Sequence, residues 1–270
     1  MQVIIITGAS DGIGAEMARQ LAAQRGPQVS LVLAARKVSN LQAIASQCST
    51  WGSPTLVMPT DVTVHAQCQN LVAAAVSHFG RLDALINNAG VSAQALFADV
   101  KAEDLGWYED LMRITLWGSM WCTHAALPHL KKSRGHLVAV SSLAGLVGVP
   151  GRTAYSATKF AMTGFFEALR AELRGNGVSV TTAYPGVVAT QIRYRGLNAQ
   201  GLPAGSSGLK EDDAMSVEEC ARLILRGMQA REREVVMSSK GRIGRFVKLL
   251  APGLVEKMAW AALKDDVKPR

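Results

Sequence analysis

Three polar side chains in the second half of the chain have the types and the spacing of a proton-transfer site. Tyr155 and Lys159 are four residues apart in a helical pattern, so both side chains project from one helix face. A phenol ordinarily has a pKa of about 10, and a neighbouring ammonium group favours the phenolate, which suits tyrosine to acid/base work at neutral pH. Ser142, thirteen residues before Tyr155, could hydrogen-bond a substrate carbonyl. Taken alone, such a pair is usually an ordinary pair on a helix surface.

A glycine-rich segment near the start of the chain predicts a dinucleotide site. The apolar run Val3–Thr7 leads into Thr7–Gly14, TGASDGIG, which opens a helix. Its three glycines permit a tight turn, a close approach to a pyrophosphate and close helix packing, while the helix start offers free N–H groups to phosphates. An ordinary strand-to-helix turn is the alternative. The residues expected to contact the cofactor here are Gly8, Ser10, Gly12, Ile13 and Gly14.

The end of the second apolar run favours NADP over NAD. A site for NAD normally carries an acidic residue there, which binds the ribose 2′-hydroxyl. This chain has Ala35 and Arg36 instead, and a guanidinium is suited to a 2′-phosphate. Asp11 argues mildly against this interpretation, because an acid in the glycine-rich loop would lie near the same phosphate.

The elements that must position these residues alternate between short apolar runs and longer helical patterns. Runs rich in Val, Ile and Leu without strict alternation are typical of parallel strands buried on both faces. They are Val3–Thr7, Val29–Ala35, Thr55–Pro59, Ala84–Asn87, His136–Ser141 and Val178–Tyr184, and the helical stretches are Ile13–Gln24, Ser39–Gln47, His65–Phe79, Leu111–Lys131 and Tyr155–Arg174. This order predicts an α/β fold: a single domain over residues 1–270, with a Rossmann-type, doubly wound parallel sheet and helices on both faces.

Further polar motifs follow the predicted strands, where ligands bind in open parallel sheets. Asp61-Val62 follows the third strand, Asn87-Asn88-Ala89-Gly90 the fourth and Ser141-Ser142 the fifth. Together with the glycine-rich loop and the Tyr155/Lys159 pair, they resemble the short-chain dehydrogenase/reductase (SDR) family, in its main single-domain branch. The resemblance runs from Val3 to about Thr190.

The resemblance implies a role for each matching residue. Tyr155 would be the general acid/base, Ser142 would orient the carbonyl, and Lys159 would bind the nicotinamide ribose and favour the phenolate. The cofactor would further be contacted by Asp61, Val62, Asn88, Ala89, Gly90, Pro185, Gly186, Val188 and Thr190, with Asp61 at the adenine, Val188 and Thr190 at the carboxamide, and Asn87 lining the cleft. A helix-start cap for Asp61 and a turn role for Asn87 stay open as alternatives.

One position departs from the family pattern. Family members usually carry an Asn in the helix before the fifth strand, where it helps hold a water relay behind the lysine. The matching position, twenty-seven residues before Ser142, is Thr115. A hydroxyl can hold a water, but it is shorter and offers one polar group instead of two. We therefore place Thr115 among the candidate catalytic residues and expect retained, slower turnover.

Two features of the sequence bear on the substrate. Tyr155–Leu173 and Ser141–Gly145 are similar to the branch that includes 11β-hydroxysteroid dehydrogenase and related lipid-active reductases. The Gly/Ser/Pro-rich segment around residues 191–215 predicts a substrate loop or lid. Its Ile192, Tyr194, Leu197 and Leu202 suit a hydrophobic alcohol or ketone. A loop that packs on itself is an equal alternative.

The net charge of +8 is concentrated at the C-terminus. From Arg222 onward there are twelve basic and five acidic residues, which leaves +1 for the rest of the chain, so the body gives no support to nucleic-acid binding. Residues 241–270 predict a basic amphipathic extension: Arg242–Leu250 is one helix, and Pro252 separates it from a second, Leu254–Leu263. Helices packed on the body or on a partner subunit are the plainer interpretation, and peripheral contact with an anionic membrane is the alternative.

Composition and cysteine pattern complete the expectations. Cys48, Cys68, Cys122 and Cys220 are widely spaced, which favours reduced thiols over disulfides or a metal site. The first strand pattern begins at Val3, and no apolar run reaches the ~18 residues of a membrane span, so we expect a cytoplasmic protein without a signal peptide.

The sequence therefore predicts an NADP(H)-dependent oxidoreductase. It would transfer a hydride between nicotinamide and a carbonyl or alcohol, with a hydrophobic ketone, steroid-like or lipid-like molecule as substrate. A catalytically weak NADP-binding scaffold or sensor is the alternative, motivated by Thr115 and the basic tail. The family resemblance implies a homodimer or homotetramer.

Overall fold

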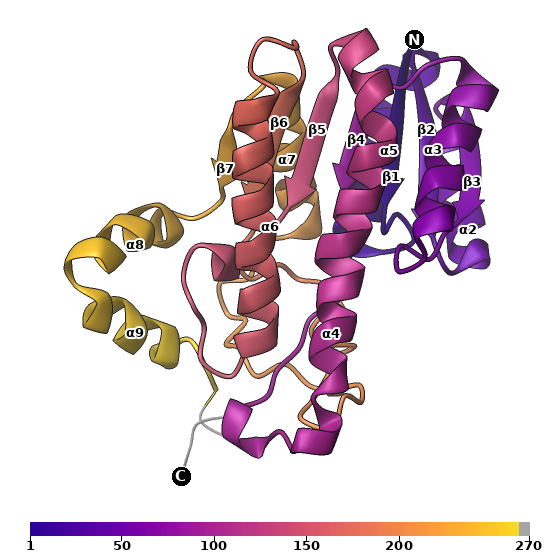
Figure 1. The fold of residues 1–270 in the computed structure, drawn as a ribbon. Helices are drawn as coiled ribbons and strands as arrows, with labels where there is room; N and C mark the ends of the chain where they lie inside the picture. Colours follow the sequence, from indigo (N-terminus) through magenta and orange to yellow (C-terminus); the bar gives the residue numbers. More distant parts are fainter. Residues whose placement is uncertain (265–270) are drawn as a thin grey trace.

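The computed structural model describes residues 1–264, apart from the side chain of Lys240, so residues 265–270 of the predicted extension lie outside the described residues. Seven parallel strands form one sheet with the order β3-β2-β1-β4-β5-β6-β7 (Figure 1). The strands are β1 (Gln2–Thr7), β2 (Val29–Ala35), β3 (Thr55–Pro59), β4 (Ala84–Asn87), β5 (His136–Val140), β6 (Ser179–Tyr184) and β7 (Glu234–Val236). The reversal of order between β1 and β4 confirms the predicted doubly wound sheet.

Helices cover both faces of this sheet, because the central strands are apolar on both sides. On one face α1 (Gly12–Arg25), α2 (Val38–Ser49) and α7 (Val217–Gln229) bury Leu21, Leu41 and Ile224 against the sheet. On the other face α3 (His65–Phe79), α5 (Gly118–Ser133) and α6 (Thr153–Glu172) bury Leu71, Cys122 and Phe166. The burial of these apolar side chains is the main force that holds the layers together.

Two features differ from the predicted elements. The stretch Leu111–Lys131 is not one regular helix: α4 (Gly106–Met112) joins α5 through a π-helical turn, Arg113–Trp117, which contains Thr115. The sequence also gave no expectation for α7 and β7. Three residues are too few for a recognisable apolar run, and β7 forms because it can pair with β6 at the sheet edge.

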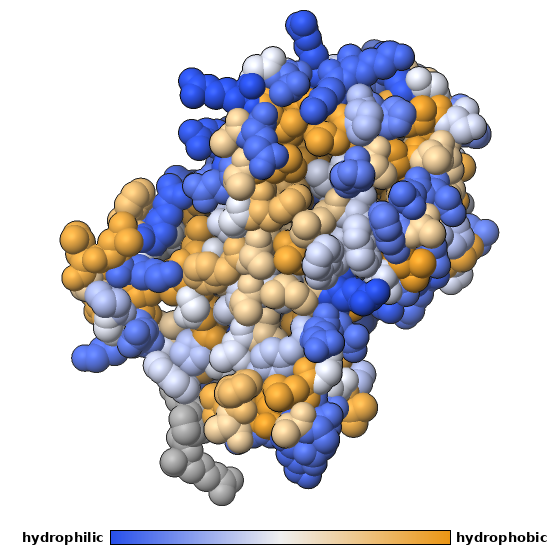
Figure 2. Space-filling view, in the orientation of Figure 1, coloured by the Kyte–Doolittle hydropathy of each residue, from blue (hydrophilic) through white to orange (hydrophobic). Residues whose placement is uncertain are grey.

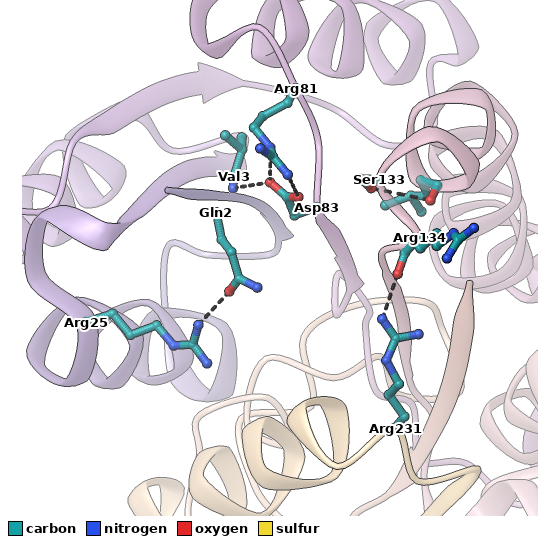
Figure 3. A network of polar contacts seen from close by, with 9 residues as sticks. Gln2, Val3, Arg25, Arg81, Asp83, Ser133, Arg134 and Arg231 are labelled. Carbon is teal, nitrogen blue, oxygen red and sulfur yellow. Dashed lines mark hydrogen bonds and ion pairs between the residues drawn. The ribbon is translucent and has the colours of Figure 1, made fainter. Parts of the chain in front are cut away.

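The amino ends of the strands are joined by polar contacts (Figure 3). The buried carboxylate of Asp83 accepts the backbone N–H of Val3 at 2.8 Å and forms a two-pronged ion pair with Arg81. Arg25 donates to the side chain of Gln2, and Arg231 to the carbonyl of Arg134. The Asp83–Val3 bond ties β1 to the start of β4, and Arg25 and Arg231 tie neighbouring segments to this edge, opposite the predicted site.

A helical hairpin projects from the sheet at the C-terminal end of the described chain (Figure 1). Its helices are α8 (Ser239–Leu250) and α9 (Pro252–Ala261), so the break falls at the predicted proline. Beyond α9, the backbone of Leu263 pairs with Leu209 in the long segment between β6 and α7. Among residues 1–264, no helix combines the length and the apolar character needed to cross a membrane.

Candidate active site

The carboxyl ends of the parallel strands bring the predicted site residues to one edge of the sheet. The glycine-rich loop follows β1, Arg36 follows β2, and Asp61 and Val62 follow β3. Asn88, Ala89 and Gly90 follow β4, Ser142 follows β5, and Pro185, Gly186, Val188 and Thr190 follow β6. Tyr155 and Lys159 come from the first two turns of α6, which begins beside the same edge.

The glycine-rich loop is folded so tightly that side chains would not fit at Gly8 or Gly14. Gly8 has a φ of +68°, and a Cβ there would lie 2.9 Å from the Cα of Ala89. A Cβ on Gly14 would lie 2.3 Å from the carbonyl oxygen of Gly8. The Asn88 side chain donates to the carbonyls of Thr7 and Gly8 at 3.0 and 3.3 Å. Asn88 therefore acts from below the loop by fixing the turn, a role that the sequence alone did not indicate.

Asp11, which argued against a 2′-phosphate, has two local partners. Its carboxylate caps α1 by accepting the N–H of Gly12 at 2.7 Å, and it forms an ion pair with Arg195. Arg195 belongs to the segment that follows Thr190. The methyl group of Thr190 lies 3.5 Å from the position that a Cβ on Gly12 would take. The loop after β6 therefore reaches over the start of α1, and Arg195 offsets the charge of Asp11.

The residues predicted to bind the adenosine part of the cofactor follow β2 and β3, which are neighbours in the sheet. Arg36 is exposed directly after β2, and the backbone N–H of Ala9 in the glycine-rich loop bonds to Ala34 in β2 at 3.2 Å. The Asp61 carboxylate accepts hydrogen bonds from the backbone and hydroxyl of Thr63 at 2.9 and 2.8 Å. Asp61 thus shapes the turn after β3 and does not cap α3, whose first turn is preceded by Val64, so the helix-start cap weighed as its alternative is absent. Val62 packs against Gly118 of α5.

Lys159 lies buried at the centre of the predicted proton-transfer site. Its ammonium donates to the carbonyl of Val140, the last residue of β5, at 2.9 Å, and lies 5.7 Å from the ring centre of half-buried Tyr155. Lys159 is 5% exposed, and none of the described carboxylates forms an ion pair with it. Burial therefore lowers its pKa from 10.5 to about 8. The spacing of Tyr155 and Lys159 taken alone would have suggested a pair on a helix surface, but Lys159 is buried.

Ser142 is held at the end of β5 by the loop that follows β6. Its hydroxyl donates to the carbonyl of Pro185 at 3.4 Å and accepts the N–H of Ala144 at 3.2 Å. The first contact is long, so it leaves the hydroxyl free to turn toward another acceptor. The carbonyl of Val188 accepts a hydrogen bond from Arg193 at 2.8 Å, which fixes the start of the long segment.

Thr115 lies where the family resemblance places an asparagine. It is 1% exposed, in the π-helical turn between α4 and α5. A Cβ on Gly90 would lie 3.6 Å from the Thr115 hydroxyl and 3.8 Å from the Lys159 ammonium, so both groups border the same small space. Asn87, the last residue of β4, is buried; its side chain donates to Thr123 at 2.9 Å and keeps an unpartnered oxygen.

The sequence reasoning missed two buried arginines, of which Arg152 lies beside Tyr155. Arg152 immediately precedes α6 and is 6% exposed, with its guanidinium 5.4 Å from the ring centre of Tyr155. Arg193 is 7% exposed and forms an ion pair with Glu211. The position of Arg152, three residues before Tyr155, was the one available signal.

Comparison with known proteins decides the family. The model of the short chain dehydrogenase family matches residues 2–199. The chain belongs to the short-chain dehydrogenase/reductase family. As an SDR oxidoreductase it uses a nicotinamide cofactor and acts on small molecules. The family prediction made from the glycine-rich loop, the Asn87–Gly90 motif and the Tyr155/Lys159 pair is confirmed.

Several plant proteins are similar to this SDR over most of their length. "11-beta-hydroxysteroid dehydrogenase-like 4A" from Arabidopsis thaliana is 36% identical over 255 residues, which cover 94% of this chain and 82% of the relative. "11-beta-hydroxysteroid dehydrogenase A" from Arachis hypogaea is also 36% identical, covering 94% and 73%. A Dictyostelium discoideum protein, "Dehydrogenase/reductase SDR family protein 7-like", is 30% identical, covering 99% and 83%.

A solved structure shares the fold. The alcohol dehydrogenase from the archaeon Thermococcus sibiricus, solved in complex with 5-hydroxy-NADP, superposes with a TM-score of 0.74 at 23% identity. The match covers 88% of this chain and 96% of the archaeal chain. It confirms the Rossmann-type arrangement of the sheet and helices.

Proposed function

We propose that this SDR is an NADP(H)-dependent enzyme that interconverts a ketone and a secondary alcohol, with Tyr155 as acid/base. The observation that carries the proposal is the buried Lys159 ammonium, bonded to the end of β5 and beside the Tyr155 ring. A buried cation is costly to maintain, and it favours an adjacent phenolate. A purely structural role would not require a lysine at position 159.

The residues at the sheet edge fit a dinucleotide phosphate. The loop that tolerates no side chain at Gly8 or Gly14 leaves its backbone open to a pyrophosphate, and α1 begins there with its free N–H groups. Arg36 would bind the 2′-phosphate, and Val188 and Thr190 the carboxamide. When bound, the nicotinamide gives or takes the hydride. The 5-hydroxy-NADP complex of the archaeal relative supports this choice of cofactor.

The protein's own side chains would supply orientation and protons. Ser142 hydrogen-bonds the substrate oxygen, and Tyr155 gives its proton to that oxygen in reduction or takes one in oxidation. Lys159 stabilises the phenolate electrostatically. The small space bordered by Thr115 and Lys159 would hold a water that returns the proton from bulk solvent.

For the substrate we propose a molecule with a hydrophobic body. The predicted lid, residues 191–215, exposes Ile192, Tyr194 and Leu202, which are 38%, 37% and 60% accessible, whereas Leu197 is packed against the segment after β4. Side chains of this kind suit an apolar ligand. The hydroxysteroid dehydrogenase names of the plant relatives point in the same direction.

A substrate panel tests the proposed activity. NADPH and NADH oxidation would be measured with steroid, aromatic and medium-chain ketones, and Tyr155→Phe provides the inactive control. We expect turnover with NADPH that Tyr155→Phe reduces at least about 100-fold, because the proton donor is removed. Tight NADPH binding with no turnover on the whole panel would instead identify a cofactor-binding scaffold or sensor.

We also propose that the hairpin α8–α9 rests on an anionic membrane surface. Ile243, Phe246, Leu249 and Leu250 are between 59% and 90% exposed, and hydrophobic residues gather at the projecting end of the hairpin (Figure 2). Arg242, Arg245, Lys248 and Lys257 accompany them. Exposed apolar side chains beside basic ones are typical of helices that lie in a membrane interface.

Vesicle sedimentation separates this surface from an interface between copies. Binding to vesicles with anionic lipid, weakened by salt and by Phe246→Ser with Leu249→Ser, would support membrane contact. A double substitution that leaves vesicle binding unchanged contradicts it, and one that dissociates an oligomer shows subunit contact instead.

For the predicted homodimer or homotetramer, α5 and α6 are our proposed interface, with half-exposed Trp121 and Phe165; fully buried Phe166 belongs to the core.

A further inference from the structure

Arg152 is a buried charge without a compensating acid. It is 6% exposed, its Nε is buried with no hydrogen-bond partner, and none of the described carboxylates forms an ion pair with it. The guanidinium instead lies 5.4 Å from the ring centre of Tyr155. Buried charges are normally paired, because an unpaired one loses its hydration without replacement. An arginine left in this state beside a reacting tyrosine calls for an anion.

Arg193 offers a second donor near the same place. Its guanidinium bonds to Glu211 at 2.8 Å, to Ser207 at 3.2 Å and to the carbonyl of Val188 at 2.8 Å. Its Nη2 is nevertheless buried without a partner. Burial first, and then the charge of Arg193, lower the pKa of Arg152, so the two guanidinium groups are close enough to repel each other.

The fold brings the two arginines to opposite sides of one short segment. Ala95 pairs with Arg152 along the backbone, and its N–H bonds to the carbonyl of Gly151 at 2.9 Å. Two residues earlier, Ala93 pairs with Leu197 of the lid, and the N–H of Gln94 bonds to Leu197 at 2.8 Å. Residues 93–95 therefore tie the start of α6 to the segment that carries Arg193.

The charges around Tyr155 do not cancel. Glu211 offsets Arg193, which leaves the positive charges of Arg152 and Lys159, 5.4 and 5.7 Å from the ring centre of Tyr155. Lys159 has its role in acid/base chemistry, whereas Arg152 has none in the proposed reaction. A neutral ketone would supply no negative charge to pair with Arg152.

We propose that Arg152, with the free N–H group of Arg193, binds a carboxylate of the substrate, so that the enzyme acts on oxo acids and hydroxy acids with an apolar body. The carboxylate only binds: the bonds that change remain those of the carbonyl or carbinol carbon and of the oxygen that exchanges its proton with Tyr155. A planar guanidinium is well matched to a carboxylate. This inference rests on the proposed oxidoreductase function and adds the charge of its substrate.

Matched acids and esters test the proposal. Aryl oxo acids with one to three carbons between carbonyl and carboxylate would be compared with their methyl esters by kcat/KM. We expect the wild-type enzyme to prefer the acids at least about tenfold, since a hydrogen bond between charged groups is worth that much or more. Arg152→Gln should remove the preference, so that the ratio of kcat/KM for each acid to that for its ester falls to about one, whereas Arg152→Lys should retain part of it.

The control variant is Arg222→Gln, which removes an arginine paired with Glu219 on the exposed side of α7 and should leave the preference intact. NADPH affinity, measured by fluorescence, distinguishes a substrate anion from a cofactor phosphate. If Arg152→Gln weakens NADPH binding and the acid preference persists, Arg152 serves the cofactor and the proposal is overturned. Equal wild-type rates on acids and esters also overturn it, and that comparison needs no variant to fold.

A binding measurement separates this proposal from the proposed function. If no ketone is reduced at all, the oxidoreductase assignment fails first. Thermal denaturation with benzoate, and with benzamide as the neutral match, then tests Arg152 by itself. Stabilisation by benzoate that is absent with benzamide and lost in Arg152→Gln supports the anion site, and equal or absent effects refute it.

Discussion

The two edges of the sheet treat buried charge in opposite ways. At the amino edge, the carboxylate of Asp83 accepts the N–H of Val3 and both prongs of Arg81 (Figure 3). At the carboxyl edge, Lys159 and Arg152 are as deeply buried, and none of the described acids pairs with either. One edge has its charges satisfied within the chain, and the other leaves them for something that binds.

This difference separates a structural role from a functional one. A paired charge stabilises the fold and is insensitive to ligands, whereas an unpaired buried cation costs stability until a phenolate or an anion lies beside it. Strain of this kind concentrates at functional sites. Substitutions at the two edges should therefore have opposite effects on stability and activity.

Lys159→Met should have the largest effect. Removal of the ammonium takes away the charge that favours the phenolate, and we expect kcat to fall at least about 100-fold in the ketone assay. The free energy of unfolding near pH 7 should rise, because an apolar side chain replaces a buried charge. A Lys159→Met enzyme that keeps near wild-type kcat would refute the proposed role of Lys159.

The pH dependence of stability should show the same lysine. Its pKa is about 8 in the folded, cofactor-free protein and 10.5 unfolded. Below pH 8 both states are protonated and the burial penalty is complete. Between pH 8 and 10.5 the folded state releases its proton first, so wild type should gain about 3 kcal/mol relative to Lys159→Met as pH rises. Denaturant unfolding of both proteins across this range measures the change; parallel curves would contradict it.

Asp83→Asn should show the inverse behaviour at the other edge. The amide cannot accept both the Val3 N–H and the Arg81 fork, so we expect the unfolding free energy to fall by about 2 kcal/mol. Activity per folded molecule should stay within about twofold. A large loss of kcat with unchanged stability would remove the distinction between the edges.

Arg36→Gln extends the comparison to an exposed cation at the carboxyl edge. We expect NADPH binding to weaken about tenfold, while NADH binding changes little, because only the 2′-phosphate would contact this side chain. Fluorescence titrations with both cofactors check this. Equal effects on the two cofactors would place the 2′-phosphate elsewhere.

Thr115→Asn should have the smallest effect. A longer side chain with two polar groups reaches further into the space beside Lys159, so we expect kcat to increase by a few-fold with unchanged NADPH affinity. Steady-state kinetics would measure the change in kcat, and solvent isotope effects would show whether proton transfer limits turnover. An inactive wild-type enzyme with an active Thr115→Asn variant would show that the proton relay beside Lys159 is broken in the natural chain. A slower variant would show that the Thr115 hydroxyl serves the relay better than an amide.

Local sequence patterns determined the elements and the motifs at their ends. The apolar runs from Val3 to Tyr184 predicted six of the seven strands, and TGASDGIG predicted the turn at Gly8, because backbone geometry there depends on neighbouring residues. The pattern also placed Tyr155 and Lys159 on one helix face. The Tyr155/Lys159 spacing could not show that Lys159 is buried, since burial depends on β5 and on the turn after Ser142.

Only the tertiary structure decided which charges have partners. Asp11 is offset by Arg195, which is 184 residues away along the chain, and Asp83 reaches across the sheet to Val3. Arg152 and Arg193 are brought together by the pairing of residues 93–95 with both their segments. Electrostatic energies depend on distance and burial, and folding sets both between residues that the sequence keeps apart. The sequence alone could therefore locate most of the net charge in the C-terminal tail, +7 of the total of +8, but it could not show which charges in the predicted site are unpaired.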